Sequence, residues 1–307
     1  MRARGNRGTP SGWTASAARP RGLAAALAEQ VDSNRSAVGH EASFAQHRAR
    51  LTAEIAARAP DAKRGRLCLL GAGNAYDVDL PALAACFAEI HLVDIDRPAA
   101  LGAMARVPPA VGARLVAHAP LDVSGMFDRL DVWSRTPPPS DTLGAVIDSA
   151  VERVAAALPG PFDVVVSCSL LTQLQLVLVQ VVGDANPRFD ELRDAFNRAH
   201  MRTLGALLAP DGVGLLVTDL TGSAIHPPLD DLPEAADLQK VMSDVLAAGA
   251  YIYAAHPGRL TSEMRRDPRL NRVFELRYPI GPWIWRNGPT QSFLVYGVEI
   301  RRRAASP

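Results

Sequence analysis

Short apolar runs of the β type alternate with longer helical patterns between residues 66 and 254, and this alternation limits the folds open to the chain. It predicts parallel strands joined by crossover helices. Most of the runs are apolar throughout, which is typical of strands that helices cover on both faces. The expected strands are 66–70, 89–93, 114–117, 163–167, 213–217 and 251–255.

A last apolar run, 292–300, closely follows the segment "ELRYPI", and we expect it to enter the sheet antiparallel. The predicted fold is a doubly wound α/β fold, in which helices cover both faces of a mostly parallel, seven-stranded sheet with an antiparallel last strand. Helical spacing of apolar residues predicts helices at 192–208, near 42–58 and near 141–158.

The chain has 307 residues, of which 48% are hydrophobic, so it can bury a large core. Residues 1–28 contain five arginines and no acidic residue, and they lack the apolar stretch of a secretory signal. We expect residues 1–35 to form a disordered basic tail, which is favoured over a transit peptide. Residues 36–307 are predicted to form a single domain, with 257–290 as an excursion from a minimal fold.

The charge is almost balanced, with 33 Lys and Arg against 32 Asp and Glu. No global field therefore draws the chain to nucleic acid or to an anionic membrane. No apolar run approaches the roughly 18 residues of a membrane span. Cys68, Cys86 and Cys168 form no CxxC pair, which argues against a metal site and favours a reducing compartment. A cytoplasmic protein without membrane or nucleic-acid partners is the expectation.

Two glycines follow the first expected strand, in the sequence "LLGAGNAYD". Gly71 and Gly73 fall at the carboxyl end of that strand, where open α/β sheets bind ligands. Glycine lacks a Cβ atom and lets a ligand approach the main chain. A helix follows from Leu80, with Asp79 as its expected N-cap.

The same turn does not suit a nucleotide phosphate. Tyr76 occupies the position where a dinucleotide-binding turn has a third small residue, and Asp77 and Asp79 add negative charge. A phosphate loop of the Walker type is excluded because no G-K-[ST] sequence follows. Asp77 is better suited to a cationic group of a ligand.

The stretch "LLGAGNAYD" resembles the first motif, G-x-G-x-x-x-D, of class I S-adenosylmethionine-dependent methyltransferases. Three later stretches fit the same resemblance in order and spacing: "HLVDID", "APLDVSG", and "LLAPDGVGLLVTD", in which Asp211 replaces a glycine. The resemblance covers residues 40–220. Asn74 and Ala75 depart from it, since many members have a third glycine in this turn, and this leaves the shape of the methionine pocket open.

The resemblance implies that S-adenosylmethionine is the cofactor and that the chain has the Rossmann-like fold of the family. It implies that Asp94 binds the ribose hydroxyls, that Asp122 and Val123 lie at the adenine edge, and that Asp77 or a main-chain carbonyl accepts the ammonium group. The implied cofactor site consists of Gly71, Gly73, Asn74, Asp77, Asp94, Ile95, Asp122, Val123 and Ser167.

The acceptor is not identified by the sequence. Ser169 and Gln173 follow the strand at 163–167, and Asp219 and His226 follow the strand at 213–217, so these four are the candidates for acceptor contacts. A histidine can remove a proton near neutral pH, although a solvated loop histidine is the more ordinary explanation of His226. No catalytic residue is assigned, because methyl transfer from a sulfonium mainly requires alignment of the acceptor.

A small molecule is the expected acceptor, and other functions stay open. RNA could be bound by the arginines and tryptophans of 257–290, which are Arg265, Arg266, Arg269, Arg272, Trp283 and Trp285. A solvated helix face, followed by tryptophans that cover an edge or line a substrate mouth, is favoured. A non-catalytic cofactor-binding scaffold is the alternative from a different class. An aminopropyl transferase would need acids that "SCSLL" lacks, and a nicotinamide-dependent oxidoreductase comes last because of Tyr76.

Overall fold

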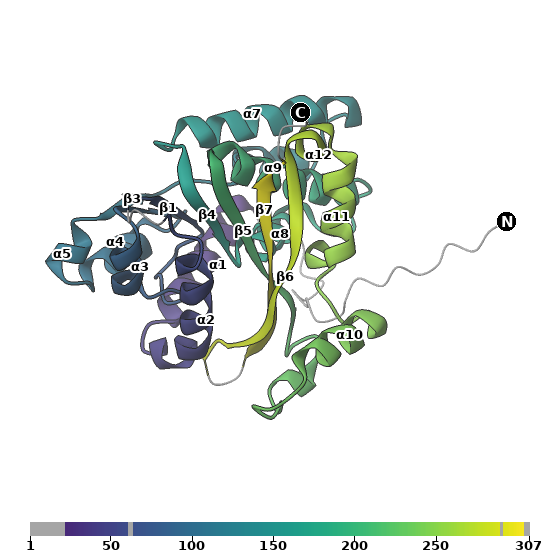
Figure 1. Ribbon diagram of the computed structural model, residues 1–307. Helices are drawn as coiled ribbons and strands as arrows, with labels where there is room; N and C mark the ends of the chain where they lie inside the picture. The colour runs from purple at the N-terminus through teal and green to yellow at the C-terminus, as the bar shows by residue number, and fades with distance from the viewer. Residues whose placement is uncertain (1–21, 61–63, 289–290, 304–307) are drawn as a thin grey trace.

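A computed structural model of the chain describes residues 22–60, 64–288 and 291–303 (Figure 1). Seven strands form one sheet in the order β3-β2-β1-β4-β5-β7-β6. β7 is antiparallel to both of its neighbours, β5 and β6, and the other pairs of strands are parallel. This topology confirms the predicted doubly wound, Rossmann-like sheet with an antiparallel last strand. The strands are β1 (Arg66–Leu70), β2 (Glu89–Val93), β3 (Leu115–His118), β4 (Phe162–Cys168), β5 (Leu208–Gly222), β6 (Phe274–Arg286) and β7 (Ser292–Arg302).

Helices cover both faces of the sheet, as the apolar strands require. The α-helices are α1 (Leu23–Ser36), α2 (Ala45–Ala56), α3 (Leu80–Cys86), α4 (Arg97–Ala105), α5 (Pro109–Gly112), α6 (Leu130–Trp133), α7 (Leu143–Ala156), α8 (Leu170–Val182), α9 (Phe189–Leu207), α10 (Leu238–Ala248), α11 (Pro257–Arg266) and α12 (Pro268–Val273). Short 3-10 helices are η1 (Glu41–Phe44), η2 (Phe127–Arg129), η3 (Ser140–Thr142), η4 (Pro227–Leu229) and η5 (Tyr253–Ala255). The helices expected at 192–208, near 42–58 and near 141–158 correspond to α9, α2 and α7.

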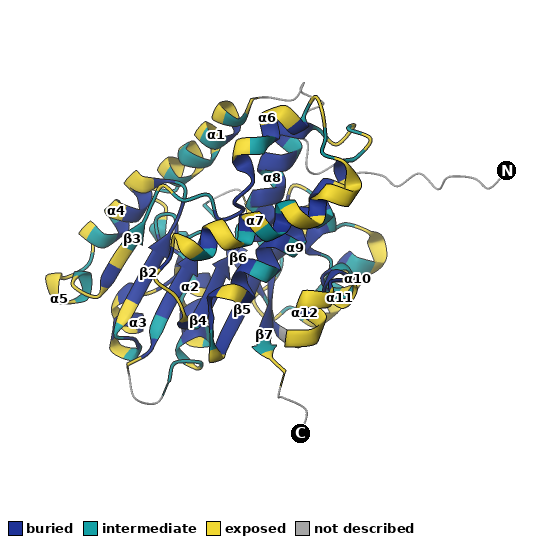
Figure 2. Cartoon of the chain, turned by 90° about the horizontal axis from the view of Figure 1, so that it is seen from above, coloured by how far each residue is buried: buried dark blue, intermediate teal, exposed yellow. Residues whose placement is uncertain are grey.

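Alternate side chains of the strands enter two different cores. Leu69 of β1 packs with Leu51 of α2 and Leu83 of α3 on one face, whereas Leu70 packs with Leu204 of α9 on the other. Figure 2 shows the strands in dark blue between helices whose outer sides are yellow. Because both faces are covered, the polar residues that matter for binding are confined to the ends of the strands.

The amino-terminal segment differs from the expectation of a disordered tail over residues 1–35. Residues 1–21 lie outside the described part of the chain, but Leu23–Ser36 form helix α1. The helix is held by tertiary contacts: Ala26 is fully buried against α8, and the Asn34 side chain donates a hydrogen bond to Asp96 at 3.0 Å. Its apolar stripe is weak, so the sequence pattern alone does not reveal it.

The expected strand at 251–255 is wrong. Residues Tyr253–Ala255 form the 3-10 helix η5, because β7 occupies the edge of β5 where another strand would pair. The sheet instead gains β6, which lies within the segment 257–290 that was expected to be an excursion. That segment therefore contributes a strand of the central sheet.

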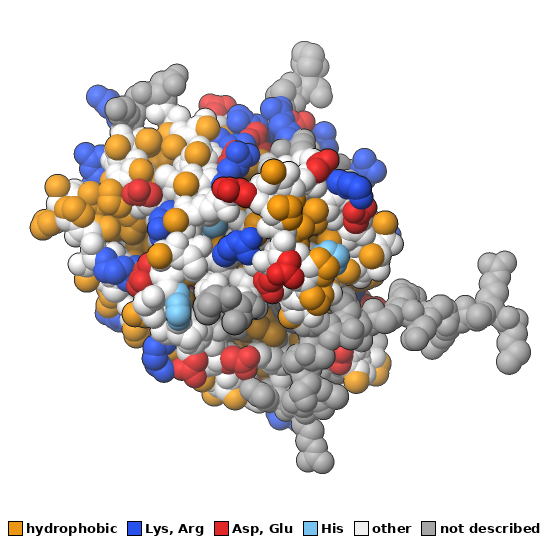
Figure 3. Space-filling model, turned by 90° about the horizontal axis from the view of Figure 1, so that it is seen from below, with side chains coloured by type: hydrophobic (Ala, Val, Ile, Leu, Met, Phe, Trp, Pro, Cys, Tyr) orange, Lys and Arg blue, Asp and Glu red, His pale blue; other side chains and the backbone are white. Residues whose placement is uncertain are grey.

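Charges of both signs are interspersed on the surface. Figure 3 shows Lys and Arg side chains next to Asp and Glu side chains across the face that it presents. The arginines expected to lie on a solvated helix face do so, and two of them pair with acids: Arg269 with Asp148 at 2.6 Å and Arg266 with Glu263 at 3.9 Å. None of the helices in the described ranges combines the length and apolar content needed to cross a bilayer.

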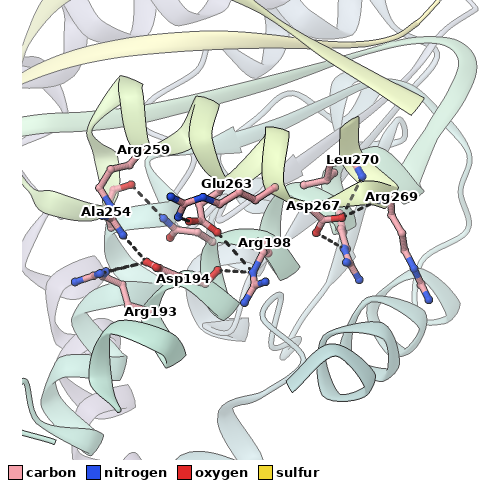
Figure 4. Close-up of polar contacts among 12 residues, drawn as sticks. Arg193, Asp194, Arg198, Ala254, Arg259, Glu263, Asp267, Arg269 and Leu270 are labelled. Carbon is pink, nitrogen blue, oxygen red and sulfur yellow. Dashed lines mark hydrogen bonds and ion pairs between the residues drawn. The ribbon is translucent and has the colours of Figure 1, made fainter. Parts of the chain in front are cut away.

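Ion pairs fasten α11 and the segment before it to α9 (Figure 4). Asp194 of α9 lies between two arginines, Arg193 at 3.2 Å and Arg259 of α11 at 2.7 Å. Further along the same helices, Arg198 faces Glu263 at 3.6 Å. These contacts place α11 and α12 of the 251–273 segment against the helical layer, while β7 occupies the edge of β5.

Candidate functional site

An open pocket lies at the carboxyl ends of β1, β2 and β4, and α1 forms part of its wall. Its volume is about 1070 Å³, which includes space open to solvent. The wall consists of the turn after β1 (71–77), residues after β2 and β3, the first turns of α8, and Trp285 of β6. A pocket at the carboxyl edge of a parallel sheet lies where open α/β folds bind their ligands.

The two glycines of the first turn line the pocket where the main chain packs closely against its neighbours. Gly71 and Gly73 have positive φ angles of 75° and 46°, a conformation that other residues adopt at a cost. A Cβ atom on Gly71 would lie 3.0 Å from the side chain of Leu170, and one on Gly73 would lie 2.9 Å from Oδ1 of Asn34. Both positions therefore depend on glycine for close packing between this turn, α8 and α1.

Asp94, at the end of β2, is positioned by main-chain amides. Its Oδ2 accepts a hydrogen bond from Gly73 N at 2.7 Å, and its Oδ1 accepts one from Asp96 N at 2.8 Å. Burial raises the pKa of this carboxyl, and the amide hydrogen bonds oppose that shift. Asp94 and its neighbour Ile95 both line the pocket. The carboxylate is thus fixed with its remaining acceptor capacity available to a ligand.

Asp122 lines the pocket, but its side chain also organises the turn in which it lies. Oδ1 accepts hydrogen bonds from the amide and hydroxyl of Ser124 at 2.8 and 2.6 Å, and Oδ2 accepts one from the amide of Phe127 at 2.8 Å. Val123 lies next to it in the pocket wall and is buried. A structural role in the turn accounts for the Asp122 side chain, whatever ligand it meets.

Asp77 faces a buried histidine that the sequence motifs do not include. Trp283 Nε1 donates to His47 Nδ1 at 2.9 Å, so the neutral imidazole carries its proton on Nε2. That Nε2 lies 3.5 Å from Asp77 Oδ1. Burial lowers the pKa of His47 to about 3, which keeps the ring neutral, and the ring stacks on Trp285 with centroids 4.8 Å apart.

A second aspartate lies behind the pocket wall. Asp219, on β5, is 3% exposed and accepts a hydrogen bond from the Thr172 hydroxyl at 2.9 Å. Burial raises the pKa of Asp219 to about 6 and, with a further contribution from the Asp219 charge, raises the pKa of Asp77 to about 7. The two carboxyls therefore form a pair that disfavours holding two negative charges at neutral pH.

The structure brings most of the residues predicted from the sequence to this pocket. Those in its wall are Gly71, Gly73, Asn74, Asp77, Asp94, Ile95, Asp122, Val123, Ser169 and Gln173. Ser167, Asp219 and His226 are not in the wall. Ser167 is fully buried and its hydroxyl contacts His200 Nε2 at 2.8 Å, while His226 precedes the short helix η4.

Sequence reasoning missed His47 and the contribution of α1. His47 falls on the helix predicted near 42–58, where Phe44 and Leu51 define the apolar stripe, and a polar residue beside that stripe was the available signal. Trp285, one of the two tryptophans expected to cover an edge or to line a substrate mouth, is in the pocket wall and lies on the edge strand β6. Among the residues the structure describes, no group of three or more His, Cys, Asp or Glu is arranged to hold a metal ion.

The strand order and the place of the antiparallel strand β7 decide the fold family. The chain has the Rossmann-like fold of class I methyltransferases. No protein-family model and no curated protein matches the sequence. The assignment of the fold therefore rests on the strand order and directions alone.

Solved structures of similar fold exist at low identity. The glycopeptide N-methyltransferase MtfA, complexed with S-adenosylmethionine, is 16% identical over 83% of this chain and 93% of its own, with a TM-score of 0.42. A TehB-like S-adenosylmethionine-dependent methyltransferase from Corynebacterium glutamicum is 12% identical over 86% of this chain and 99% of its own, with a TM-score of 0.40. A structure from work on the conversion of a disulfide bond into a thioacetal group during echinomycin biosynthesis is 13% identical over 84% and 82%, with a TM-score of 0.45. These likenesses assign neither ligand nor reaction to this chain.

Proposed function

We propose that the chain binds S-adenosylmethionine in this pocket and transfers its methyl group to a small molecule. One observation supports the proposal above others: residues from three separate motifs, at the ends of β1, β2 and β3, line the same pocket. Gly73 and Asp94 are moreover joined by a hydrogen bond of 2.7 Å, so the first two motifs form one structural unit. The strand order brings the three motifs to one edge of the sheet, and their side chains share one pocket there.

The residues present fit the cofactor. Asp94 offers a fixed carboxylate to the ribose hydroxyls, and Val123 offers an apolar surface to the adenine ring. The turn at Gly71 and Gly73 leaves the main chain bare for the methionine portion, at positions where a Cβ atom would crowd Leu170 and Asn34. Hydrogen bonds from ribose hydroxyls to a carboxylate are worth roughly 1.5–3 kcal/mol each.

When bound, the cofactor supplies a methyl group on a sulfonium, which is already activated for displacement. The protein then has to align the acceptor and exclude water. Helix α1 and Trp285 are suited to the second task, because both lie in the wall of the pocket and Trp285 is only 7% exposed. We also propose a cytoplasmic location, which the three free cysteines support.

Isothermal titration of the purified chain with S-adenosylmethionine and with its product, S-adenosylhomocysteine, tests the cofactor assignment. We expect both to bind, and ATP and NAD to bind at least about tenfold more weakly, since the turn lacks a phosphate-binding arrangement. Absence of binding of both sulfur compounds at millimolar concentration would refute the proposal. Formation of S-adenosylhomocysteine with a pool of small metabolites distinguishes an enzyme from a scaffold that only binds.

A further inference from the structure

We propose that the methyl acceptor is an uncharged molecule with an aromatic ring, bound against Phe44 and Trp285 at the Asp77 end of the pocket. This inference rests on the proposed function, since it names the substrate class of the same pocket. Three observations support it: the described wall has no basic side chain, each of its acidic side chains has another partner, and three aromatic rings line it where the adenosine does not reach.

The described wall gives an anionic acceptor no counter-charge. Neither Lys nor Arg occurs among the residues described there. Two arginines contact the turn after β1 without lining the pocket. Arg48 donates to the main-chain oxygen of Tyr76 at 3.1 Å, and Arg106 donates to the main-chain oxygen at position 74. Because a charge that leaves water without gaining a partner is costly, a carboxylate or phosphate acceptor is disfavoured.

The acidic side chains of the wall leave no place for a cationic acceptor. They are Asp77, Asp94 and Asp122. Asp122 accepts hydrogen bonds within its own turn through both oxygens. Asp94 is held by two main-chain amides and is assigned to the ribose hydroxyls. Asp77, with 19% of its side chain exposed, is the carboxyl that remains for the ammonium of the cofactor itself. This wall therefore suits an acceptor without charge.

Three aromatic rings of the wall form one cluster. They come from separate segments: Phe44 from η1, Tyr76 from the turn after β1, and Trp285 from β6. The centroid of the Phe44 ring lies 5.8 Å from that of Tyr76 and 5.6 Å from that of Trp285. The Trp285 ring also stacks on His47 at 4.8 Å and lies 5.1 Å from Phe293. Packing of this kind fixes the rings before any ligand binds.

The cluster lies away from the proposed adenine site. Val123 follows β3 at one edge of the sheet, whereas Trp285 belongs to β6 at the other edge. The cluster is instead close to Asp77: Tyr76 precedes it in the chain, and the His47 ring that stacks on Trp285 has its Nε2 3.5 Å from Asp77 Oδ1. The rings thus adjoin the methionine portion of the cofactor, on the side of the pocket that the adenosine leaves to the acceptor.

An aromatic ring on the acceptor matches this cluster. Aromatic rings attract one another in offset-stacked and edge-to-face arrangements, beyond the effect of the area that they bury. Gln173 and Asn287 also line the pocket, and a side-chain amide both donates to and accepts from uncharged polar groups of a ligand. The wall therefore offers an uncharged aromatic acceptor both stacking and hydrogen bonds.

A phenol is the simplest nucleophile of this class, since it is uncharged below a pKa of about 10. Its oxygen forms the new C–O bond to the methyl carbon as the C–S bond breaks, and the electrons of that bond go to sulfur, giving a neutral thioether. The hydroxyl proton passes to water at the open side of the pocket. The product is an uncharged methyl ether, which suits the same wall.

2-Naphthol is a suitable probe, because it is aromatic and uncharged at neutral pH. 2-Naphthoate and 2-naphthylmethylammonium are the matched anion and cation, and decahydro-2-naphthol is uncharged but has no aromatic ring. Binding of each to the full chain is measured by calorimetric titration, with and without saturating S-adenosylhomocysteine. We expect 2-naphthol to bind at least about tenfold more tightly than either ion, which would lose hydration without gaining a counter-charge.

The aromatic ring should contribute separately, so that 2-naphthol binds at least about threefold more tightly than decahydro-2-naphthol. Equal or tighter binding of either ion would overturn the inference. Equal binding of the two uncharged compounds, or no binding of any of the four, would overturn it as well.

Substitutions of the rings test where the probe binds. Trp285→Leu keeps an apolar side chain but removes the ring, and it should reduce the preference for 2-naphthol over decahydro-2-naphthol. Phe44→Leu repeats the test at a second ring. Trp133→Leu is the matched control, because Trp133 is buried on α6 and does not line the pocket, and it should leave the preference unchanged. An unchanged preference in both ring variants, with folding checked by melting temperature, would contradict the role of the cluster.

A substitution that adds a charge tests the electrostatic part of the inference. Asn287→Arg supplies the counter-charge that the described wall lacks, and it should raise the affinity for 2-naphthoate at least about threefold. Asn271→Arg places the same charge on the exposed side of α12 and is the matched control. Unchanged 2-naphthoate binding in Asn287→Arg would contradict the exclusion of anions by lack of counter-charge.

The two proposals fail in different ways. If S-adenosylhomocysteine binds but 2-naphthol shows no preference, the cofactor assignment stands and the acceptor class is wrong. If 2-naphthol binds through Trp285 but neither sulfur compound binds, the aromatic site stands and the methyltransferase proposal is wrong.

Discussion

His47 Nε2 lies 3.5 Å from Asp77 Oδ1, and Nδ1 of the same ring accepts a hydrogen bond from Trp283 at 2.9 Å. The two residues come from segments on either side of β1, and the tryptophan comes from β6, more than 200 residues later in the chain. A neutral histidine with a fixed tautomer therefore faces the carboxyl that lines the pocket. Packing of this kind restricts the geometry of a side chain at a site.

The hydrogen bond from Trp283 should be needed for stability. Trp283→Phe keeps the aromatic packing but leaves the buried Nδ1 of His47 without its donor, which typically costs about 1–3 kcal/mol. We expect a loss of free energy of unfolding in that range, measured by urea titration. Trp285→Phe is the matched control, because Trp285 Nε1 has no hydrogen-bond partner among the described residues, and its cost should be smaller. Equal losses would show that the hydrogen bond contributes nothing.

The pH dependence of stability should change when Asp77 is replaced. Burial, and then the charge of Asp219, raises the Asp77 pKa from 3.8 to about 7. A carboxyl with a raised folded-state pKa adds stability that is fully present below its unfolded pKa and is lost as pH rises through its folded pKa. The melting temperature of the wild type relative to Asp77→Asn should therefore fall between about pH 4 and pH 7, as measured by calorimetry.

His47 acts in the opposite direction and has to be separated from this effect. Burial lowers its pKa from 6.5 to about 3, so its contribution is present above pH 6.5 and is lost as pH falls. Because both variants in the comparison retain His47, the difference between them isolates Asp77. Parallel melting curves over the whole range would contradict the raised pKa of Asp77.

The Asp94 carboxylate should contribute to cofactor affinity. Asp94→Ala removes the proposed acceptor of the ribose hydroxyls, and we expect S-adenosylhomocysteine to bind about 2 kcal/mol more weakly in calorimetric titration. Asp94→Asn retains one acceptor oxygen and should lose less. Since Asp94 also accepts from Gly73, the melting temperature of each variant has to be measured alongside. Unchanged affinity in folded Asp94→Ala protein would remove the ribose assignment.

Asp267 should be the most sensitive member of the ion pairs that bind the 251–273 segment to α9. Its side chain is fully buried, pairs with Arg202 at 2.7 Å, and accepts the amides of Arg269 and Leu270 at the start of α12. Asp267→Ala removes a buried, charge-assisted hydrogen bond from Arg202, which keeps its pair with Asp148 at 2.6 Å, and we expect a loss of about 1.5–3 kcal/mol in the free energy of unfolding. Asp244→Ala breaks the exposed pair with Lys240 and should leave the unfolding curve unchanged.

Local patterns predict much of this fold and of the cofactor side of the pocket. The glycine turn and Asp94 are recognisable because each depends on residues next to it: a buried strand before it and a helix start after it. Most strands are identified for the same reason. Two residues predicted for the cofactor site, Ser167 and Asp122, have structural partners instead: the Ser167 hydroxyl contacts His200 of α9, and the Asp122 carboxylate accepts hydrogen bonds within its own turn.

The rest depends on contacts between distant segments. The run at 251–255 is as apolar as a strand. It forms the 3-10 helix η5 instead, because β7 already pairs with the edge of β5. The pairing of Asp77 with His47 and Asp219 joins α2, the first turn and β5, which no spacing rule relates. The stretch "SCSLL" itself contains no acidic residue. Folding nevertheless brings the carboxyls of Asp77 and Asp219 close to it.

Helix α1 has a practical consequence for anyone who expresses or trims this protein. Its residues Gln30, Ser33 and Asn34 are part of the pocket wall, and the main chain at Asn34 holds the side chain of Asn74 in the glycine turn. A version cut back to residue 37 would keep the entire sheet but lose one side of the binding site. Purification tags at this end belong before residue 22, with the helix left whole.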